Sequence, residues 1–197
     1  LGPRVAERVF VTRHIKEHMP EAFDFDIPSV CAIAPGVLGV TGVETMDIVF
    51  GVANKVKPDL IIAVDALASR RAARISTTIQ LSDSGISPGS GVGNTRADLS
   101  RANLGVPVIA VGVPLVVYAS TISQDTISLI ADETGLHGDE ARLRELAEQV
   151  IAKHMGDFIV TPKDIDVIVE DMAGIIANAI NSALFGNNLE QVRNMLA

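Results

Sequence analysis

Cysteine is almost absent from this sequence of 197 residues, because Cys31 is the only one. A single cysteine excludes an internal disulfide, and no Cys/His cluster has the spacing of zinc ligands. We therefore expect a reducing, cytoplasmic compartment rather than secretion. Cys31 lies in a short apolar run, so we expect it to be buried and unreactive.

Basic residues are fewer than acidic ones, with 16 Lys+Arg against 24 Asp+Glu, which gives a formal net charge of -8. This balance argues against phosphate-backbone binding as the main activity, and we predict no direct nucleic-acid partner. The uncharged stretch 105–123 is interrupted by Pro107 and Pro114. It lacks the unbroken apolar run of about 20 residues that a membrane helix needs, so no membrane partner is predicted.

Hydrophobic residues make up 48% of the chain, which is enough for a sizeable core and one domain. Short apolar or β-branched runs predict strands. These runs are Val30–Ala34, Leu60–Val64, Ile75–Leu81 and Val106–Val113. Helical spacing of apolar residues predicts helices between and after them. The helical segments are Arg4–Met19, a helix after the loop 36–42 with Thr41 as N-cap and an apolar stripe from Val43 to Val56, Ala66–Arg74, Ser120–Glu133, Asp139–His154 and Asp164–Leu184.

This alternation of strands and helices predicts an α/β fold, with a mostly parallel sheet flanked by helices. We expect residues 1–197 to form a single α/β core. Within it, residues 134–157 are charged and amphipathic, unlike the strand region, and are predicted to be an appended helical segment.

Asp65 is the first candidate for chemistry, because it directly follows the apolar run Leu60–Val64. Ligand crevices of open α/β sheets lie at the carboxyl ends of strands, where a buried acid is a credible general acid or base. The alternative is that Asp65 caps the helix predicted at Ala66–Arg74, which is the commoner role for such a residue.

A second candidate is the loop rich in glycine and serine near residue 90. Its backbone N–H groups could approach a ligand closely, through Gly89, Ser90, Gly91, Gly93 and Asn94. The glycine spacing departs from that of dinucleotide-binding and P-loop motifs. We therefore favour a structural or peptide-binding loop over a phosphate site, and no cofactor is predicted.

Other reactive residues carry weaker signals. His14 and His18 have the i, i+4 spacing of a shared metal site, but no third ligand follows in pattern, so two surface histidines are favoured. Ser69 and Ser90 have no recognisable His-Asp relay. Glu44 and Asp47 fit structural or solvated positions on a helix. No metal site is predicted from these residues.

Several long motifs resemble those of the germination proteases of bacterial spores. They are PGVLGVTGVET at 35–45, KPDLIIAVDALASR at 57–70, GISPGSGVGN at 85–94, LGVPVIAVGVP at 104–114 and VTPKDID at 160–166. The resemblance is strong over 1–126 and 158–184, and it does not cover 134–157.

The resemblance implies an endopeptidase that initiates degradation of small acid-soluble spore proteins in the spore core during germination. It implies a fold similar to that of the hydrogenase-maturation endopeptidases. It also implies synthesis as a zymogen, loss of an N-terminal pro-segment by self-cleavage, and assembly of tetramers. The Gly-rich loop would then be a substrate-side wall.

The resemblance also implies an atypical aspartic mechanism with two essential acids. One maps onto Asp65, and the other lies two residues before the Leu-Gly-Pro motif that stands here at 1–3. We therefore expect this chain to be truncated at its N-terminus and inactive by itself. A metal-dependent endopeptidase and a non-catalytic ligand-binding or assembly subunit are the alternatives.

Overall fold

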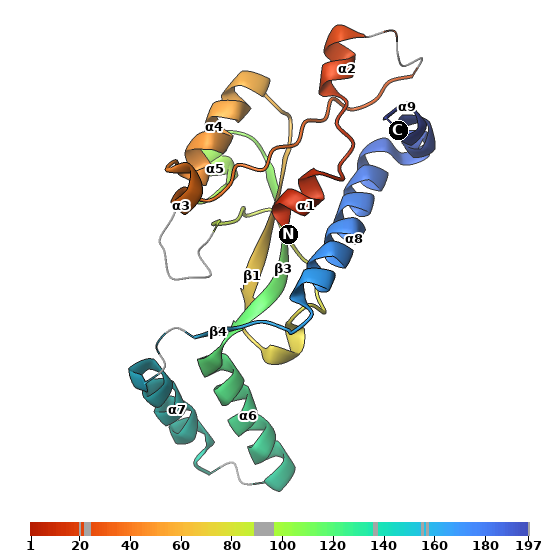
Figure 1. The fold of residues 1–197 in the computed structure, drawn as a ribbon. Helices are drawn as coiled ribbons and strands as arrows, with labels where there is room; N and C mark the ends of the chain where they lie inside the picture. The colour runs from red at the N-terminus through yellow and green to blue at the C-terminus, as the bar shows by residue number, and fades with distance from the viewer. Residues whose placement is uncertain are drawn as a thin grey trace. The chain divides into compact units, whose positions relative to one another are not determined.

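A computed structural model gives the fold of the chain (Figure 1). It describes residues 1–19, 21, 25–88, 97–135, 138–154, 156 and 158–196. The chain divides into two compact units. One, the sheet unit, is Lys57–Ile165, and the other, the helical unit, is Leu1–Val56 together with Asp166–Ala197. Strands and helices alternate along the sheet unit, which confirms the α/β class.

The sheet unit is built on four described strands. They are β1 (Ile61–Ser69), β2 (Gln80–Ser82), β3 (Val108–Tyr118) and β4 (Ile159–Val160). Strand β3 is central in the order β1-β3-β2, and β4 pairs with its carboxyl end. The longest pairing, β1 with β3, is parallel, whereas β2 and β4 run antiparallel to β3. The sheet is therefore mixed.

Strand β3 forms the core of this unit because its residues are apolar on both faces. Val113, on one face, has no exposed surface, and Val108 and Ala110, on the other, are only 2% and 4% exposed. Burying a valine or leucine side chain contributes roughly 1.5–3 kcal/mol. The register to β1 shifts between Leu67 and Ala68, beside Pro114, which has no N–H for the ladder.

The strand predictions at Leu60–Val64 and Val106–Val113 are confirmed, but both strands are longer than predicted. The helix predicted at Ala66–Arg74 is wrong, because β1 continues to Ser69 and only a 3-10 turn, η2 (Ala72–Arg74), follows. Pairing with β3 overrides the local helix preference there. The strand predicted at Ile75–Leu81 reduces to β2.

Two longer helices complete the sheet unit, which also contains the short α5 (Arg101–Leu104). They are α6 (Ala119–Thr134) and α7 (Glu140–His154), and they confirm the predicted helices to within a residue at each end. Gly135, with φ +70°, ends α6 in the left-handed conformation that favours glycine. The Gln124 side chain donates to Glu148 at 3.1 Å across the helix pair. The description of 134–157 as an appended segment stays a prediction.

The helical unit contains six helices among the described residues. They are α1 (Gly2–Ala6), α2 (Arg13–His18), α3 (Leu38–Thr41), α4 (Thr45–Val56), α8 (Ile165–Phe185) and α9 (Leu189–Leu196), with the 3-10 turn η4 (Gly186–Asn188) before α9. The single helix predicted at Arg4–Met19 is wrong, because α1 and α2 are separated by 7–12. Thr41 ends α3 rather than capping α4.

The strand predicted at Val30–Ala34 is wrong as well. This segment forms neither a helix nor a paired strand, and Cys31 is exposed rather than buried. The fully buried Thr12 side chain anchors the start of the segment. Its hydroxyl donates to the Pro28 carbonyl at 2.7 Å and accepts the Val30 N–H at 3.0 Å.

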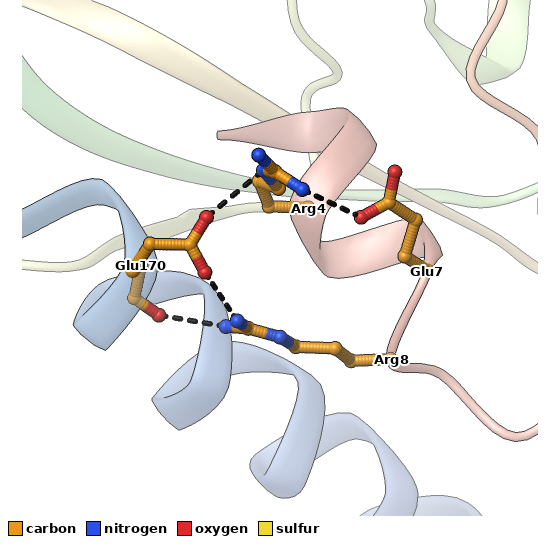
Figure 2. Close-up of polar contacts among 4 residues, drawn as sticks. All are labelled: Arg4, Glu7, Arg8 and Glu170. Atoms are coloured by element: carbon orange, nitrogen blue, oxygen red, sulfur yellow. Dashed lines mark hydrogen bonds and ion pairs between the residues drawn. The ribbon is translucent and has the colours of Figure 1, made fainter. Parts of the chain in front are cut away.

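Helix α8 binds the N-terminal segment of the helical unit through ion pairs and through hydrogen bonds of an asparagine side chain. Glu170 binds Nε of Arg4 at 2.9 Å and the guanidinium of Arg8, whose Nη1 also donates to the Glu170 carbonyl at 2.7 Å (Figure 2). Further along the helix, the buried Asn181 side chain bonds the backbone of the same segment. Gly174 lies between these points, and a Cβ there would stand 3.6 Å from Arg8 Nη1.

The helical stretch Ile165–Leu196 is long and apolar enough to cross a membrane by length and composition alone. Core helices of soluble proteins pass the same test, so this is weak evidence. The prediction of no membrane partner stays a prediction.

Candidate active site

Asp65 lies in the middle of β1 rather than at its carboxyl end. Its side chain is half-buried, and its Oδ1 accepts the backbone N–H of Ala66 at 2.8 Å. A carboxylate bonded to the next backbone N–H is restricted in its side-chain rotation. The structure therefore presents this acid from a paired strand, which is a more rigid support than a loop.

The alternative that Asp65 caps a helix is wrong, because no helix begins at Ala66. The first helical turn after β1 starts at Ala72, and its N–H donates to Oδ2 of Asp125 at 2.7 Å. Asp125 on α6 therefore satisfies the backbone donor that a capping residue would satisfy. Sequence reasoning missed this role, because the two residues are 53 positions apart in the chain.

Asp65 belongs to a row of three residues that crosses the sheet. It is in register with Gly112 of β3, which is in register with Gln80 of β2. Gly112 has no side chain, so no β3 side chain stands between Asp65 and Gln80 in this row. Adjacent strands are about 4.8 Å apart, which puts the outer two backbones roughly 10 Å from each other.

The predicted substrate-binding residues Gly89, Ser90, Gly91, Gly93 and Asn94 lie outside the described residues. The described flanks of this stretch are joined by an antiparallel bridge. Ile86 N–H donates to the Leu99 carbonyl at 3.1 Å, and Leu99 N–H donates back at 2.7 Å. Gly85, at φ +93°, allows this approach, because a Cβ there would lie 2.3 Å from the Leu99 oxygen.

Residues with possible metal or nucleophilic roles are dispersed. Within the part of the chain that the structure describes, no group of three or more His, Cys, Asp or Glu could hold a metal ion. His14 and His18 are exposed on α2. Ser69 is buried, and its hydroxyl donates to the Arg71 carbonyl at 2.5 Å, which makes it part of the turn after β1.

Ser76 is a residue that sequence reasoning did not single out. Its backbone is in the left-handed region, with φ +58°, and its N–H donates to the Pro114 carbonyl at 2.7 Å. Its buried hydroxyl has no hydrogen-bond partner among the described residues. The local sequence contains no signal for this arrangement, because the Pro114 carbonyl that binds the Ser76 N–H lies 38 positions further along the chain.

One carboxylate on a strand can remove a proton from water or donate one to a leaving group. Peptide hydrolysis needs both a base and an acid in the same site. A hydrolytic site built on Asp65 would therefore need a second acidic group or a bound cation for the other role.

Comparison with known proteins agrees with the motifs. A family model described as germination protease matches residues 1–141 and 134–195, including the segment 134–157 that the motifs did not cover. The germination protease of Clostridium tetani is 46% identical over 199 residues, which cover 93% of this chain and 61% of that protein.

Two further relatives support the same assignment. The germination protease of Caldanaerobacter subterraneus subsp. tengcongensis is 46% identical over 209 residues, covering 100% of the chain and 64% of the relative. The germination protease of Bacillus cereus is 41% identical over 229 residues, which cover 93% of this chain and 62% of that protein. The chain thus spans less than two thirds of the length of these relatives.

Proposed function

This chain belongs to the germination protease family, and from that membership we propose that it is the core of an endopeptidase acting in spore germination. The observation that carries the proposal is Asp65, a half-buried carboxylate held on a paired strand inside the family's motif. The proposed substrates are the small acid-soluble spore proteins of the spore core.

The proposed mechanism is of an atypical aspartic type with two acids. The Asp65 carboxylate takes a proton from water, whose oxygen attacks the carbonyl carbon of the scissile peptide. The second acid gives its proton to the carbonyl oxygen. The C–N bond of the tetrahedral intermediate then breaks as the proton held by Asp65 passes to the leaving amine. A hydroxyl of the intermediate returns its proton to the second acid as the C=O bond re-forms, which restores both acids.

The second acid of this mechanism precedes the Leu-Gly-Pro motif at residues 1–3, as the resemblance implies. The 197 residues by themselves are accordingly proposed to be inactive. We further propose that the protein is made as a zymogen, removes a pro-segment by self-cleavage and works as a homo-oligomer. The Gly-rich loop would bind the extended substrate through its main chain.

The test compares three proteins on a purified small acid-soluble spore protein. They are this chain, a version extended upstream through the second acid, and the extended version carrying Asp65→Asn. We expect cleavage only by the extended, unmutated version, with a loss of at least roughly a hundredfold in kcat/KM for the variant. Asp83→Asn, an exposed carboxylate in the same unit, is the matched control and should cleave normally.

Three outcomes would overturn the proposal. Normal cleavage by Asp65→Asn would remove Asp65 from the mechanism. Loss of cleavage after treatment with a chelator, with recovery on adding a divalent cation, would replace the two-acid mechanism with a metal-dependent one. Failure of the extended version to cleave at all would favour a non-catalytic subunit.

A further inference from the structure

Leu67 occupies the space beside Asp65 in the sheet. Residues at i and i+2 of a strand point to the same face, so the two side chains share one side of β1. Leu67 is in register with Pro114, whereas Asp65 is in register with Gly112. A Cβ built on Gly112 would lie 2.3 Å from Cδ1 and 2.8 Å from Cγ of Leu67.

These distances show that the Leu67 side chain leans back along the strand and lies over Gly112. Its terminal carbons fill the position that a side chain at 112 would take, next to Asp65 in the row across the sheet. An isobutyl group at this position takes up space on the β3 side of Asp65, on the face of the sheet that the two side chains share. It also replaces water on that side with an apolar surface.

A second restraint on the Asp65 carboxyl is a hydrogen bond from the next residue of its own strand. Its Oδ1 accepts the Ala66 N–H at 2.8 Å, so the carboxyl is held at one oxygen while Leu67 closes the side towards β3. With a hydrogen bond alone, a carboxylate can still rotate so that its other oxygen accepts the bond, or turn away from the site. An apolar neighbour such as Leu67 alone does not orient the carboxylate. Together they restrict both the position and the rotation of the group.

We propose that Leu67, seated over Gly112, is a positioning residue that holds the Asp65 carboxyl in its reactive orientation. Position 112 must lack a side chain for this arrangement, since even a methyl group would collide with Leu67. The inference rests on the proposed catalytic role of Asp65, but the packing that it describes can be measured without catalysis.

The first experiment uses this chain and measures hydrogen exchange of the Ala66 amide by NMR. Leu67→Ala removes the isobutyl group without creating a clash. Asp65 then gains rotational freedom, and its hydrogen bond to the Ala66 N–H opens more often. We expect exchange at Ala66 to accelerate several-fold, while Leu67→Met, which keeps the side-chain volume, stays close to the unmodified chain. Gly138→Ala, where an added Cβ meets nothing within 4 Å, is the control.

The second experiment measures cleavage of the spore protein by the extended version carrying the same substitutions. We expect Leu67→Ala to lower kcat by about tenfold to a hundredfold with KM nearly unchanged, and Leu67→Met to restore most of kcat. Gly112→Ala should lower kcat as well. If Gly112→Ala does not fold, the Leu67 variants still decide the question.

Two results would overturn the inference. One is unchanged exchange at Ala66 in Leu67→Ala, whatever the effect on cleavage. The other is accelerated exchange with an unchanged kcat, because Leu67 would then order Asp65 without serving the reaction. Normal cleavage by the extended version carrying Asp65→Asn would instead show that the proposed function of Asp65 is wrong, so the two failures can be told apart.

Discussion

The side-chain oxygen of Asn181 accepts the backbone N–H of Phe10 at 2.9 Å, across 171 positions of the chain. The Nδ2 group of the same side chain donates to the Arg8 carbonyl at 3.0 Å. Asn181 is only 3% exposed, so these bonds replace water for both of its polar ends. One carboxamide on α8 thus pairs two backbone groups of the N-terminal segment.

Replacing this carboxamide should destabilise the chain. Asn181→Ala leaves the Phe10 N–H and the Arg8 carbonyl without their partner, which costs about 1–3 kcal/mol in the free energy of unfolding. Urea denaturation measures the loss. Asn178→Ala, at an exposed position of the same helix, should change stability by less than about 0.5 kcal/mol. Equal losses in the two variants would contradict this account.

The ion pairs of Glu170 should contribute less than Asn181, and their contribution should depend on salt. The side chains of Glu170, Arg4 and Arg8 are 42%, 56% and 39% exposed, so solvent screens the pairs. We expect Glu170→Gln to cost about 0.5–1 kcal/mol at low ionic strength. In about 1 M NaCl, where the Debye length is about 3 Å, most of this difference should vanish.

The control for Glu170 is Glu190→Gln, which removes a more exposed pair with Arg193 on a single helix. It should have the smaller effect in both salt conditions. A Glu170→Gln loss that is the same at low and high salt would show that packing of the side chain, rather than its charge, stabilises the segment.

A substitution at Gly85 should disturb the bridge at the base of the Gly-rich loop. Gly85→Ala places a Cβ 2.3 Å from the Leu99 oxygen at a backbone φ of +93°, so either the bridge to Ile86 or the turn must shift. We expect a loss of more than about 1 kcal/mol, which lowers Tm by roughly 2–4 °C per kcal/mol in a chain of this size. Gly138→Ala should leave Tm unchanged, and an equal Tm for both variants would contradict the prediction.

The exposure of Cys31 predicts ready chemical reactivity of its thiol. The native chain should react with a disulfide reagent at a rate comparable to that of the urea-unfolded chain, because the side chain is exposed in the folded chain. Absorbance of the released thiolate measures both rates, and Cys31→Ser should abolish the signal. Reaction only after addition of urea would restore the original expectation of a buried thiol.

Sequence patterns predicted the long elements well and the short ones badly. The runs around Leu60–Val64 and Val106–Val113 and the helix predicted at Asp164–Leu184 carry strong periodicity, and all three are present. The segments Val30–Ala34 and Ala66–Arg74 have equally suitable local composition. Their conformation depends on whether a partner strand is available, and a local pattern contains no such information.

At the candidate site, too, the local pattern predicted part of the structure and strand pairing decided the rest. The apolar run before Asp65 marked this residue as a candidate, and the motif around it led to the family. The pattern misplaced Asp65 at a strand end, because the alanine-rich stretch that follows reads as a helix. Its pairing with β3 extends β1 to Ser69. The expected ligand loop at Gly89–Asn94 lies outside the described residues and stays a prediction.

By itself, the order of residues determined the α/β class, the two long strands of the sheet and the family, because periodicity and motif spacing are properties of neighbours along the chain. Only the tertiary structure decided that Gly112 and Leu67 meet beside Asp65, that Asp125 binds the Ala72 N–H, and that Asn181 binds the N-terminal segment. These contacts join residues from different strands and helices, and they arise when burial of the apolar faces brings those elements together.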